Sequence, residues 1–315
     1  MNETLFIDFF SRLNSRQLRV CGQLLGRVLY LGLSYHRRIT TRNLRFVHPH
    51  WPAEQVHRFA RRVFRHFGRT MIEAAHMTGL PPERCLRRID IEGAHHITEA
   101  TAKGPSLIII SAHLGSWETA LQVYPLFFKH PLLCVSKDLG LGWVDRLMTR
   151  SRTRFGNLMV PKKGAFEHML QRLRRGGSVG LMMDLNRQKQ SVEVRFMGHR
   201  ASASLGAAML AMRSKSPVFL VTCVRAPDGR LRMQVTPAIA MRRTSDLRAD
   251  LQENTQRITA AIEEAVGRNP EQWFWMQKRW ETYHAGLYTH TSIFPRGKLK
   301  NHLHHAMRKL ARTFH

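Results

Sequence analysis

Apolar residues recur at helical spacing across residues 54–78, and arginines fill the other faces of the same stretch. The apolar positions are Phe59, Val63, Phe64, Phe67 and Met71. This spacing is typical of a helix that packs one face against a core. Pro81 and Pro82 predict the end of the helix, because proline cannot continue the backbone hydrogen bonding.

A second apolar stretch, residues 18–36, is interrupted by Arg27 and followed directly by Arg37 and Arg38. It falls short of the roughly 20 uninterrupted apolar residues of a membrane-spanning helix. Two interpretations remain open. The basic flank favours a helix that lies in the membrane interface with its arginines at the headgroups. The other interpretation is an amphipathic helix that packs on the protein's own core.

Short apolar runs alternate with helical segments from residue 89 to residue 267. The predicted strands are residues 89–92, 107–111, 158–160, 178–184, 218–224 and 231–236. The predicted helices are residues 119–128, 143–154, 165–175, 205–212 and 246–267. This alternation predicts an α/β fold with a central, mostly parallel or mixed sheet flanked by helices.

The segments between these elements have their own signals. Asp228-Gly229 predicts a hairpin turn between the last two strands. Residues 185–204 are expected to form a long loop with a short extended piece at 192–196. The tail beyond residue 290 is basic and has apolar residues at helical spacing. We therefore expect a membrane-associating N-terminal helix (1–40), one α/β domain (41–290) and a basic amphipathic tail (291–315).

The charge balance changes the picture more than the overall composition does. Fifty Lys and Arg against 22 Asp and Glu give a formal net charge of +28 at pH 7. A surplus of this size indicates an anionic partner, which is nucleic acid, anionic lipid or an acidic protein. The 4 cysteines are isolated, a pattern that favours reduced thiols in a cytoplasmic setting over a disulfide scaffold or a zinc ribbon.

The candidate chemistry lies in residues 106–118. Three consecutive isoleucines predict a buried strand, and a turn of small residues after it carries His113. Ser116 is a suitable residue to cap the following helix, whose first turn contains Glu118. An imidazole and a carboxylate at a strand-to-helix turn are the parts of a general base and its orienting group.

Further motifs follow His113 and Glu118 in a recognisable order. They are Arg152-x-Arg154-x-Gly156, Asp184 after an apolar strand, Phe196-x-Gly198, and Gln272-Trp-x-Trp275 with Arg279-Trp280; Asn43-Leu44 precedes them. With its His-x4-Glu spacing in a glycine–tryptophan setting, the chain resembles the late acyltransferases of lipid A biosynthesis, over roughly residues 15–285. These lauroyl/myristoyl transferases belong to the wider lysophospholipid acyltransferase group.

The resemblance implies a glycerolipid-acyltransferase-like fold and a membrane-associated enzyme without a cofactor or metal. It implies acyl transfer from acyl carrier protein to a hydroxyl of a lipid A precursor, at the cytoplasmic face of the bacterial inner membrane. His113 is then the expected general base, and Glu118 its orienting carboxylate. The implied partners are acyl carrier protein, an anionic lipid acceptor and the membrane surface, with no nucleic acid.

Three further residues are candidates for substrate binding. Arg152 and Arg154 match the family's basic motif and are expected to hold a phosphate or the carrier's phosphopantetheine. Arg152, or backbone N–H groups near Gly115, would stabilise the thioester oxyanion. Asp184 is expected to position Arg152 or a loop. The tryptophans near residue 275 are expected to pack in the core or at the membrane interface.

Other functions remain as alternatives. A nucleic-acid-binding protein would also explain the charge, but the chain lacks a compact motif for it. A zinc hydrolase would need the paired histidines of a metal helix, which His-x4-Glu does not provide. The loop 186–190 lacks the glycine usual in the family, and Met197 replaces a common phenylalanine. These differences leave open another glycolipid or an aminolipid as the acceptor.

Overall fold

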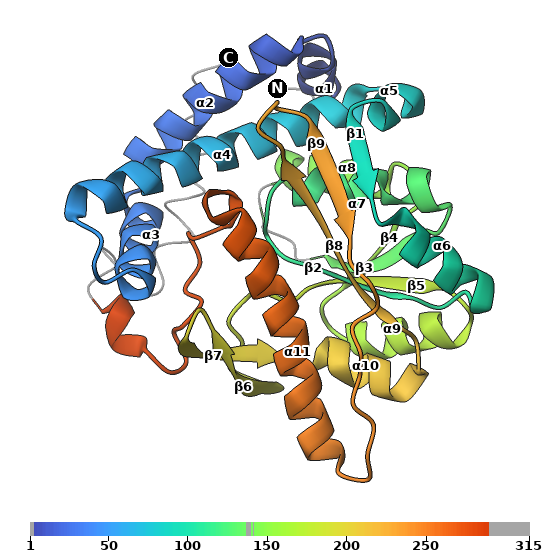
Figure 1. The fold of residues 1–315 in the computed structure, drawn as a ribbon. Coiled ribbons are helices and arrows are strands. Elements are labelled where there is room, and N and C mark those ends of the chain that lie inside the picture. Colours follow the sequence, from blue (N-terminus) through green and yellow to red (C-terminus); the bar gives the residue numbers. More distant parts are fainter. Residues whose placement is uncertain (1–2, 137–139, 141, 290–315) are drawn as a thin grey trace.

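A seven-stranded mixed sheet forms the centre of the computed structural model, which describes residues 3–136, 140 and 142–289 (Figure 1). The strand order is β1-β9-β8-β2-β5-β3-β4; β8 and β9 pair antiparallel, and the other neighbours pair parallel. The strands are β1 (Ile89–Glu92), β2 (Ile108–Ser111), β3 (Leu132–Ser136), β4 (Leu158–Pro161), β5 (Ser178–Met182), β8 (Val218–Arg225) and β9 (Leu231–Val235). The predicted α/β fold is confirmed.

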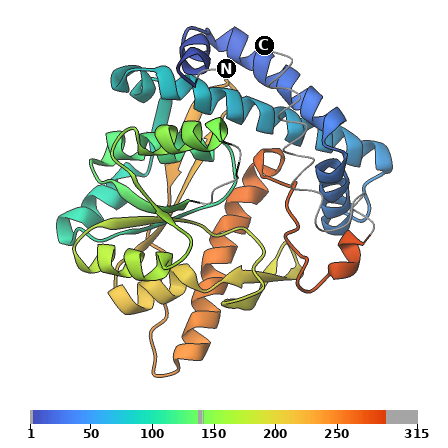
Figure 2. The same cartoon turned by 180° about the vertical axis from the view of Figure 1, so that it is seen from behind.

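Helices cover both faces of this sheet, as Figures 1 and 2 show from opposite sides. They include α5 (Pro82–Leu86), α6 (Ala94–Lys103), α7 (Trp117–Phe128), α8 (Trp143–Thr153), α9 (Ala165–Arg174), α10 (Gly206–Ser214) and α11 (Leu247–Arg268). Two 3₁₀ helices, η1 (Pro270–Gln272) and η2 (Ala285–Tyr288), follow α11 in the chain. Ile108 and Ile110 of β2 pack in one core with α9, α10 and α11. Ile109 packs in a second core with α6 and α7. The isoleucine run is apolar throughout because both faces of its strand are buried.

Four helices precede α5 and the sheet in the described part of the chain. They are α1 (Glu3–Ser11), α2 (Ser15–Gly32), α3 (Ser34–Val47) and α4 (Ala53–Gly79), the last of which confirms the helix predicted over residues 54–78. Figure 1 shows α2 lying along α4, and three glycines allow this close approach. A Cβ on Gly26 would lie 2.5 Å from the Cα of Arg65, and one on Gly68 would lie 2.4 Å from the carbonyl oxygen of Gly22. The expected domain boundary at residue 40 falls inside α3.

None of the helices in the described part of the chain has the length and apolarity that crossing a membrane requires. The single helix expected over residues 18–36 is divided at Leu33 between α2 and α3. The predicted tail, 291–315, lies outside the described residues.

The prediction of a long loop over residues 185–204 is wrong, because most of this segment forms a β-hairpin; the extended piece predicted at 192–196 is confirmed as part of its first strand. Strand β6 (Ser191–Phe196) pairs antiparallel with β7 (His199–Ser204). Met197 and Gly198 form the turn with φ of 52° and 77°, the left-handed geometry that suits the twist of a hairpin. Strand β7 consists of His-Arg-Ala-Ser-Ala-Ser and lacks the β-branched and aromatic residues that mark a strand in sequence.

Candidate active site

His113 lies in the turn that joins the carboxyl end of β2 to α7. The turn is fixed on both sides by isolated bridges, from Leu114 to Trp273 and from Gly115 to Cys223. Gly115 has φ +65°, and a Cβ there would lie 2.1 Å from the carbonyl oxygen of Cys223. Only glycine fits this position without displacing the neighbouring strand β8.

The partner of His113 is Asp184, which lies just beyond the carboxyl end of β5. Strands β2 and β5 are parallel neighbours, so their carboxyl ends lie at the same edge of the sheet. The Nδ1 atom of His113 is 2.8 Å from Oδ1 of Asp184, and the backbone N–H of His113 donates to Oδ2 at 2.9 Å. The Asp184 carboxylate therefore fixes the orientation of the ring and leaves Nε2 directed elsewhere.

This arrangement corrects the sequence-based assignment of the orienting carboxylate. Glu118 was expected to orient His113, but no hydrogen bond joins the two side chains. Asp184, expected to position Arg152 or a loop, occupies that role. The spacing of His113 and Glu118 is local and visible in sequence, whereas contact with Asp184 depends on the pairing of β2 with β5.

Trp273, one of the tryptophans expected to pack in the core or at the membrane interface, also contacts Asp184. The indole Nε1–H of Trp273 donates to Oδ2 of Asp184 at 2.9 Å, and Nε2 of Gln277 lies 3.4 Å from the same oxygen. Trp273 is fully buried, and a buried indole N–H needs an acceptor. That requirement is the only sequence signal that pointed to this role, and it did not identify the acceptor.

Glu118 instead forms a two-pronged ion pair with Arg152 of α8. Nε of Arg152 donates to Oε2 at 2.9 Å, and Nη2 donates to Oε1 at 2.5 Å. Burial lowers the pKa of Arg152, but the Glu118 carboxylate outweighs it and leaves the pKa raised, so the guanidinium stays charged. Both partners of this pair were predicted as site residues, and the structure brings them together.

Arg154 lies elsewhere. Its guanidinium donates to the carbonyl oxygens of Met77 and Thr78 at the carboxyl end of α4, and it stacks on Phe155 at 4.8 Å. A cation at this end of a helix satisfies carbonyls that have no partner within the helix. The side chain expected to bind substrate therefore caps α4.

The electrostatics of His113 combine opposing effects. Burial lowers its pKa, but the Asp184 carboxylate and, more weakly, Glu118 raise it, so the net pKa lies above the ordinary value. The pKa of Asp184 is lowered, because the charge of His113 and three hydrogen bonds outweigh the cost of its burial. The imidazolium that forms when His113 accepts a proton is thus stabilised, while 21% of its side chain stays exposed.

Aromatic rings lie beside His113. The ring centroid of His113 is 5.5 Å from that of Trp117 and 5.9 Å from that of Phe274, and Phe67 of α4 contacts both rings. All three rings are partly exposed. The histidine is therefore bordered by an apolar surface. Glu118 and Arg152 are close enough to shift the pKa of His113, the carboxylate upward and the guanidinium downward.

The backbone N–H groups expected to stabilise an oxyanion near Gly115 are already occupied. Leu114 donates to the carbonyl of Ala112, Gly115 to that of Gln272, and Ser116 to that of Cys223. Ser116 precedes α7 as predicted, but its hydroxyl bonds to Thr119 and not to the helix backbone. Arg152 remains as the candidate donor.

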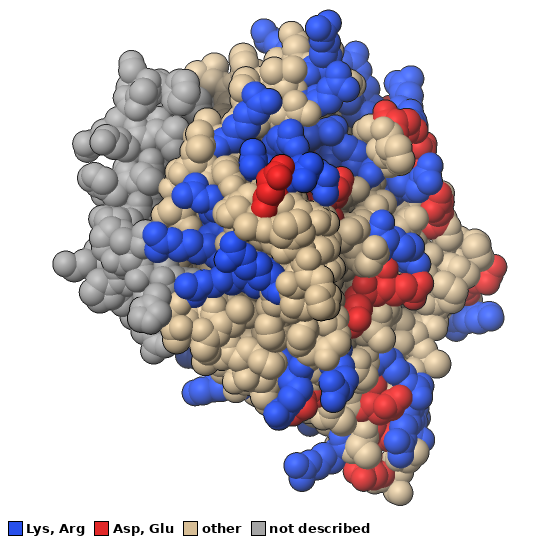
Figure 3. Space-filling view, turned by 60° about the vertical axis from the view of Figure 1, so that its left-hand side comes forward, with Lys and Arg blue, Asp and Glu red and all other residues tan. Residues whose placement is uncertain are grey.

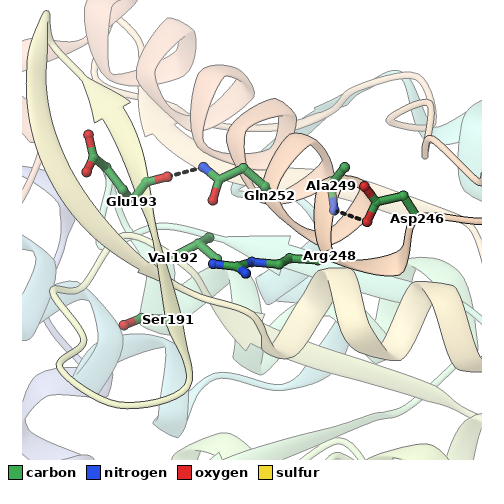
Figure 4. A pocket seen from close by; sticks show the side chains of 7 residues that line it. All are labelled: Ser191, Val192, Glu193, Asp246, Arg248, Ala249 and Gln252. Carbon is green, nitrogen blue, oxygen red and sulfur yellow. Dashed lines mark hydrogen bonds between the residues drawn. The ribbon is translucent and has the colours of Figure 1, made fainter.

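A separate surface pocket lies between β6 and the start of α11 (Figure 4). It is lined by Ser191, Val192, Glu193, Asp246, Arg248, Ala249 and Gln252. Gln252 is held there by a hydrogen bond to the carbonyl of Glu193, and Asp246 caps α11. None of the residues around His113 lines this pocket, so it lies apart from the candidate active site.

Within the described residues, no group of three or more His, Cys, Asp or Glu is placed to hold a metal ion.

The His113–Asp184 pair lies at the edge of the sheet beside a fixed arginine, an arrangement that suits proton transfer next to a developing anion. A family model described as bacterial lipid A biosynthesis acyltransferase matches residues 7–282. The chain belongs to this family and is an acyltransferase, which confirms the resemblance seen in the sequence.

Individual relatives are distant but match over most of their length. The lipid A biosynthesis palmitoleoyltransferase of Escherichia coli (strain K12) is 23% identical over 268 residues, which cover 84% of this chain and 85% of that protein. The lipid A biosynthesis lauroyltransferase of the same strain is 22% identical over 275 residues and 85% of each chain. A phosphatidylinositol mannoside acyltransferase of Mycobacterium tuberculosis (strain CDC 1551 / Oshkosh) is 25% identical over 224 residues, 68% of this chain and 67% of that protein.

Proposed function

We propose that the protein transfers a fatty acyl chain from a thioester donor to a hydroxyl of a lipid A precursor, with His113 as general base. The observation that carries this proposal is the 2.8 Å contact between Nδ1 of His113 and the buried Asp184. A ring held in this way carries its proton on Nδ1, so Nε2 is free to accept one. Mass spectrometry of the acceptor after incubation with an acyl thioester tests it.

The residues account for each step of the reaction. Nε2 of His113 takes the proton of the acceptor hydroxyl as its oxygen attacks the thioester carbonyl carbon. The negative charge that forms on the carbonyl oxygen is stabilised by Arg152, which Glu118 holds in place. The carbon–sulfur bond then breaks, and the His113 imidazolium returns the proton to the leaving thiolate. The ester and the free thiol are the products.

The acceptor and donor follow from the relatives and the charge. Two relatives carry lipid A biosynthesis in their names, which favours a lipid A precursor. The phosphatidylinositol mannoside acyltransferase keeps another glycolipid or an aminolipid open as the alternative acceptor. Figure 3 shows Lys and Arg spread widely over one face of the molecule. We propose acyl carrier protein as the donor, because an acidic carrier complements a net charge of +28.

We further propose that α1 and α2 hold the enzyme against the cytoplasmic face of the inner membrane. Val20, Leu24, Val28 and Leu31 form an apolar stripe on α2 and are 46–73% exposed. The stripe is offset by half a turn from Leu18, Gly22 and Gly26, which face α4. Leu5 and Phe9 of α1 are also exposed. An exposed apolar stripe with arginines nearby suits a helix that lies in the headgroup region.

Replacing Leu24 and Val28 with serine is expected to weaken binding to vesicles of phosphatidylethanolamine and phosphatidylglycerol. Each exposed side chain that enters the bilayer contributes about 1.5 kcal/mol, so the double variant should bind about 10²-fold more weakly in a flotation assay. Leu247→Ser is the matched control, since Leu247 is 50% exposed at the start of α11. Unchanged binding of the α2 variant would contradict this membrane orientation. Strong binding of nucleic acid, with no binding to vesicles, would favour the nucleic-acid alternative.

Glu118→Ala and Arg152→Ala are each expected to lower kcat/KM by about 10²–10³-fold, the usual cost of losing one donor to an oxyanion. The kcat/KM of the double variant should be little lower than that of the less active single variant, because the two side chains act as one unit. Arg150→Ala, an exposed arginine on the same helix, is the matched control. Losses that multiply in the double variant would show that the pair does not act together.

A further inference from the structure

His66 of α4 contacts the backbone of the His113 turn, although the proposed chemistry does not use it. Its Nε2 is 3.1 Å from the carbonyl oxygen of Gly115. The hydroxyl of Thr70, one helical turn further along α4, donates to the same oxygen at 3.1 Å. Both groups lie next to the reacting centre but point at the backbone.

The hydrogen-bond partners of His66 determine its tautomer. Its Nδ1 is 3.1 Å from Nη1 of Arg225, and a guanidinium can only donate. Nδ1 is therefore the acceptor, and Nε2 carries the proton and donates it to Gly115. Burial and the Arg225 charge lower the pKa of His66 to about 3, so the ring stays neutral in this arrangement.

Arg225 is itself firmly held. Its guanidinium pairs with Glu73 of α4, which also pairs with Arg69 at 3.6 Å. The side-chain amide of Gln272 brackets the backbone of Arg225, accepting from its N–H and donating to its carbonyl, both at 2.8 Å. Arg225 therefore donates to Nδ1 of His66 from a fixed position, and His66 in turn donates from Nε2 to the carbonyl of Gly115.

These contacts fix one peptide group of the turn at both ends. The carbonyl of Gly115 accepts from His66 and Thr70, and the N–H of Ser116, in the same peptide unit, donates to Cys223 at 2.6 Å. Because Gly115 has a positive φ and no side chain, its own preferences do not fix this peptide. His113 precedes it and Glu118 follows it closely, so a rotation of this peptide would move both.

We propose that His66 is a positioning residue: as a neutral Nε2–H donor, backed by Arg225, it holds the Gly115–Ser116 peptide so that His113 and Glu118 keep their reactive geometry. This role rests on the proposed acyl transfer at His113. Small displacements of reacting groups cost as much as 10²-fold in rate, so the contribution is measurable.

His66→Ala is expected to lower kcat by about 10–10²-fold, with KM for donor and acceptor within about twofold of wild type. His66→Gln restores an N–H donor near the position of Nε2 and should recover kcat to within about fivefold. Thr70→Val should have a smaller effect alone and should deepen the loss in the double variant, since it removes the second side-chain donor to the same carbonyl. His57→Ala is the matched control, because His57 lies on the same helix and its ring hydrogen-bonds the hydroxyl of Tyr30, away from the turn.

The thermal midpoint of each variant, measured beside kcat, separates positioning from folding. A His66→Ala enzyme that folds and keeps kcat within twofold of wild type would overturn the proposal. The proposal would also be overturned if His66→Gln did not recover kcat and if the loss of kcat in these variants matched their loss of folded protein. A wild-type enzyme that transfers no acyl chain would contradict the proposed function itself, whereas an active wild type with an unaffected His66→Ala variant contradicts only the role of His66.

Discussion

Replacing His113 with alanine is expected to lower kcat by about 10²–10⁴-fold, the contribution of a well-placed general base. The variant removes the atom that accepts the hydroxyl proton but leaves the acyl donor and lipid acceptor their other contacts. KM should therefore change little. Because the His113 side chain is partly exposed, the protein should stay folded.

His130→Ala provides the matched control, since His130 is half-buried and hydrogen-bonds a backbone carbonyl far from the turn. Rates measured with purified protein and a radiolabelled acyl donor separate the two variants. Near-wild-type turnover by folded His113→Ala protein would rule out His113 as the base.

Asp184→Asn should reduce kcat by about 10⁴-fold, the loss known for a Ser-His-Asp triad whose buried carboxylate becomes an amide. Two donors, the indole N–H of Trp273 and the backbone N–H of His113, point at Oδ2. They would hold the amide oxygen there and turn the amide NH₂ toward Nδ1. His113 would then accept at Nδ1 and carry its proton on Nε2, which is the wrong tautomer for a base.

The same variant should change the pH profile in a defined direction. In the wild type, activity is expected to fall as pH drops through the pKa of His113, which Asp184 raises above its ordinary value. Without the carboxylate, burial dominates and lowers that pKa, so the acid limb of the residual activity should move to lower pH. Asp250→Asn is the matched control, a buried aspartate that binds Thr244. An unshifted acid limb would contradict the assigned pair.

The sequence predicted the elements of the fold correctly wherever a single local pattern specifies an element. The isoleucine run, the Asp228-Gly229 turn and the stripe from Phe59 to Met71 each predicted an element that the structure contains. Strand β3 was missed, although it lies between β5 and β4 in the sheet. Its sequence, Leu-Leu-Cys-Val-Ser, is short and has no apolar–polar alternation, so periodicity alone does not identify it as a strand.

The structure brings four of the candidate residues together, but in other pairs than the sequence analysis expected. His113, Glu118, Arg152 and Asp184 all lie around the carboxyl ends of the central strands. The pairing of Asp184 with His113, and of Glu118 with Arg152, depends on strand order and on the placement of α8, which no local spacing encodes. For Arg154, the family motif predicted substrate binding, whereas in the structure its side chain donates to carbonyl groups at the end of α4.

The central claim is tested most directly by mass spectrometry of lipid acceptors after incubation with purified enzyme and acyl carrier protein loaded with chains of different length. The account predicts one added acyl chain in ester linkage on a lipid A precursor with wild-type protein, resistance of the reaction to chelation, and loss of the product with His113→Ala. The absence of an acylated product with every acceptor, or equal product from His113→Ala, would contradict it.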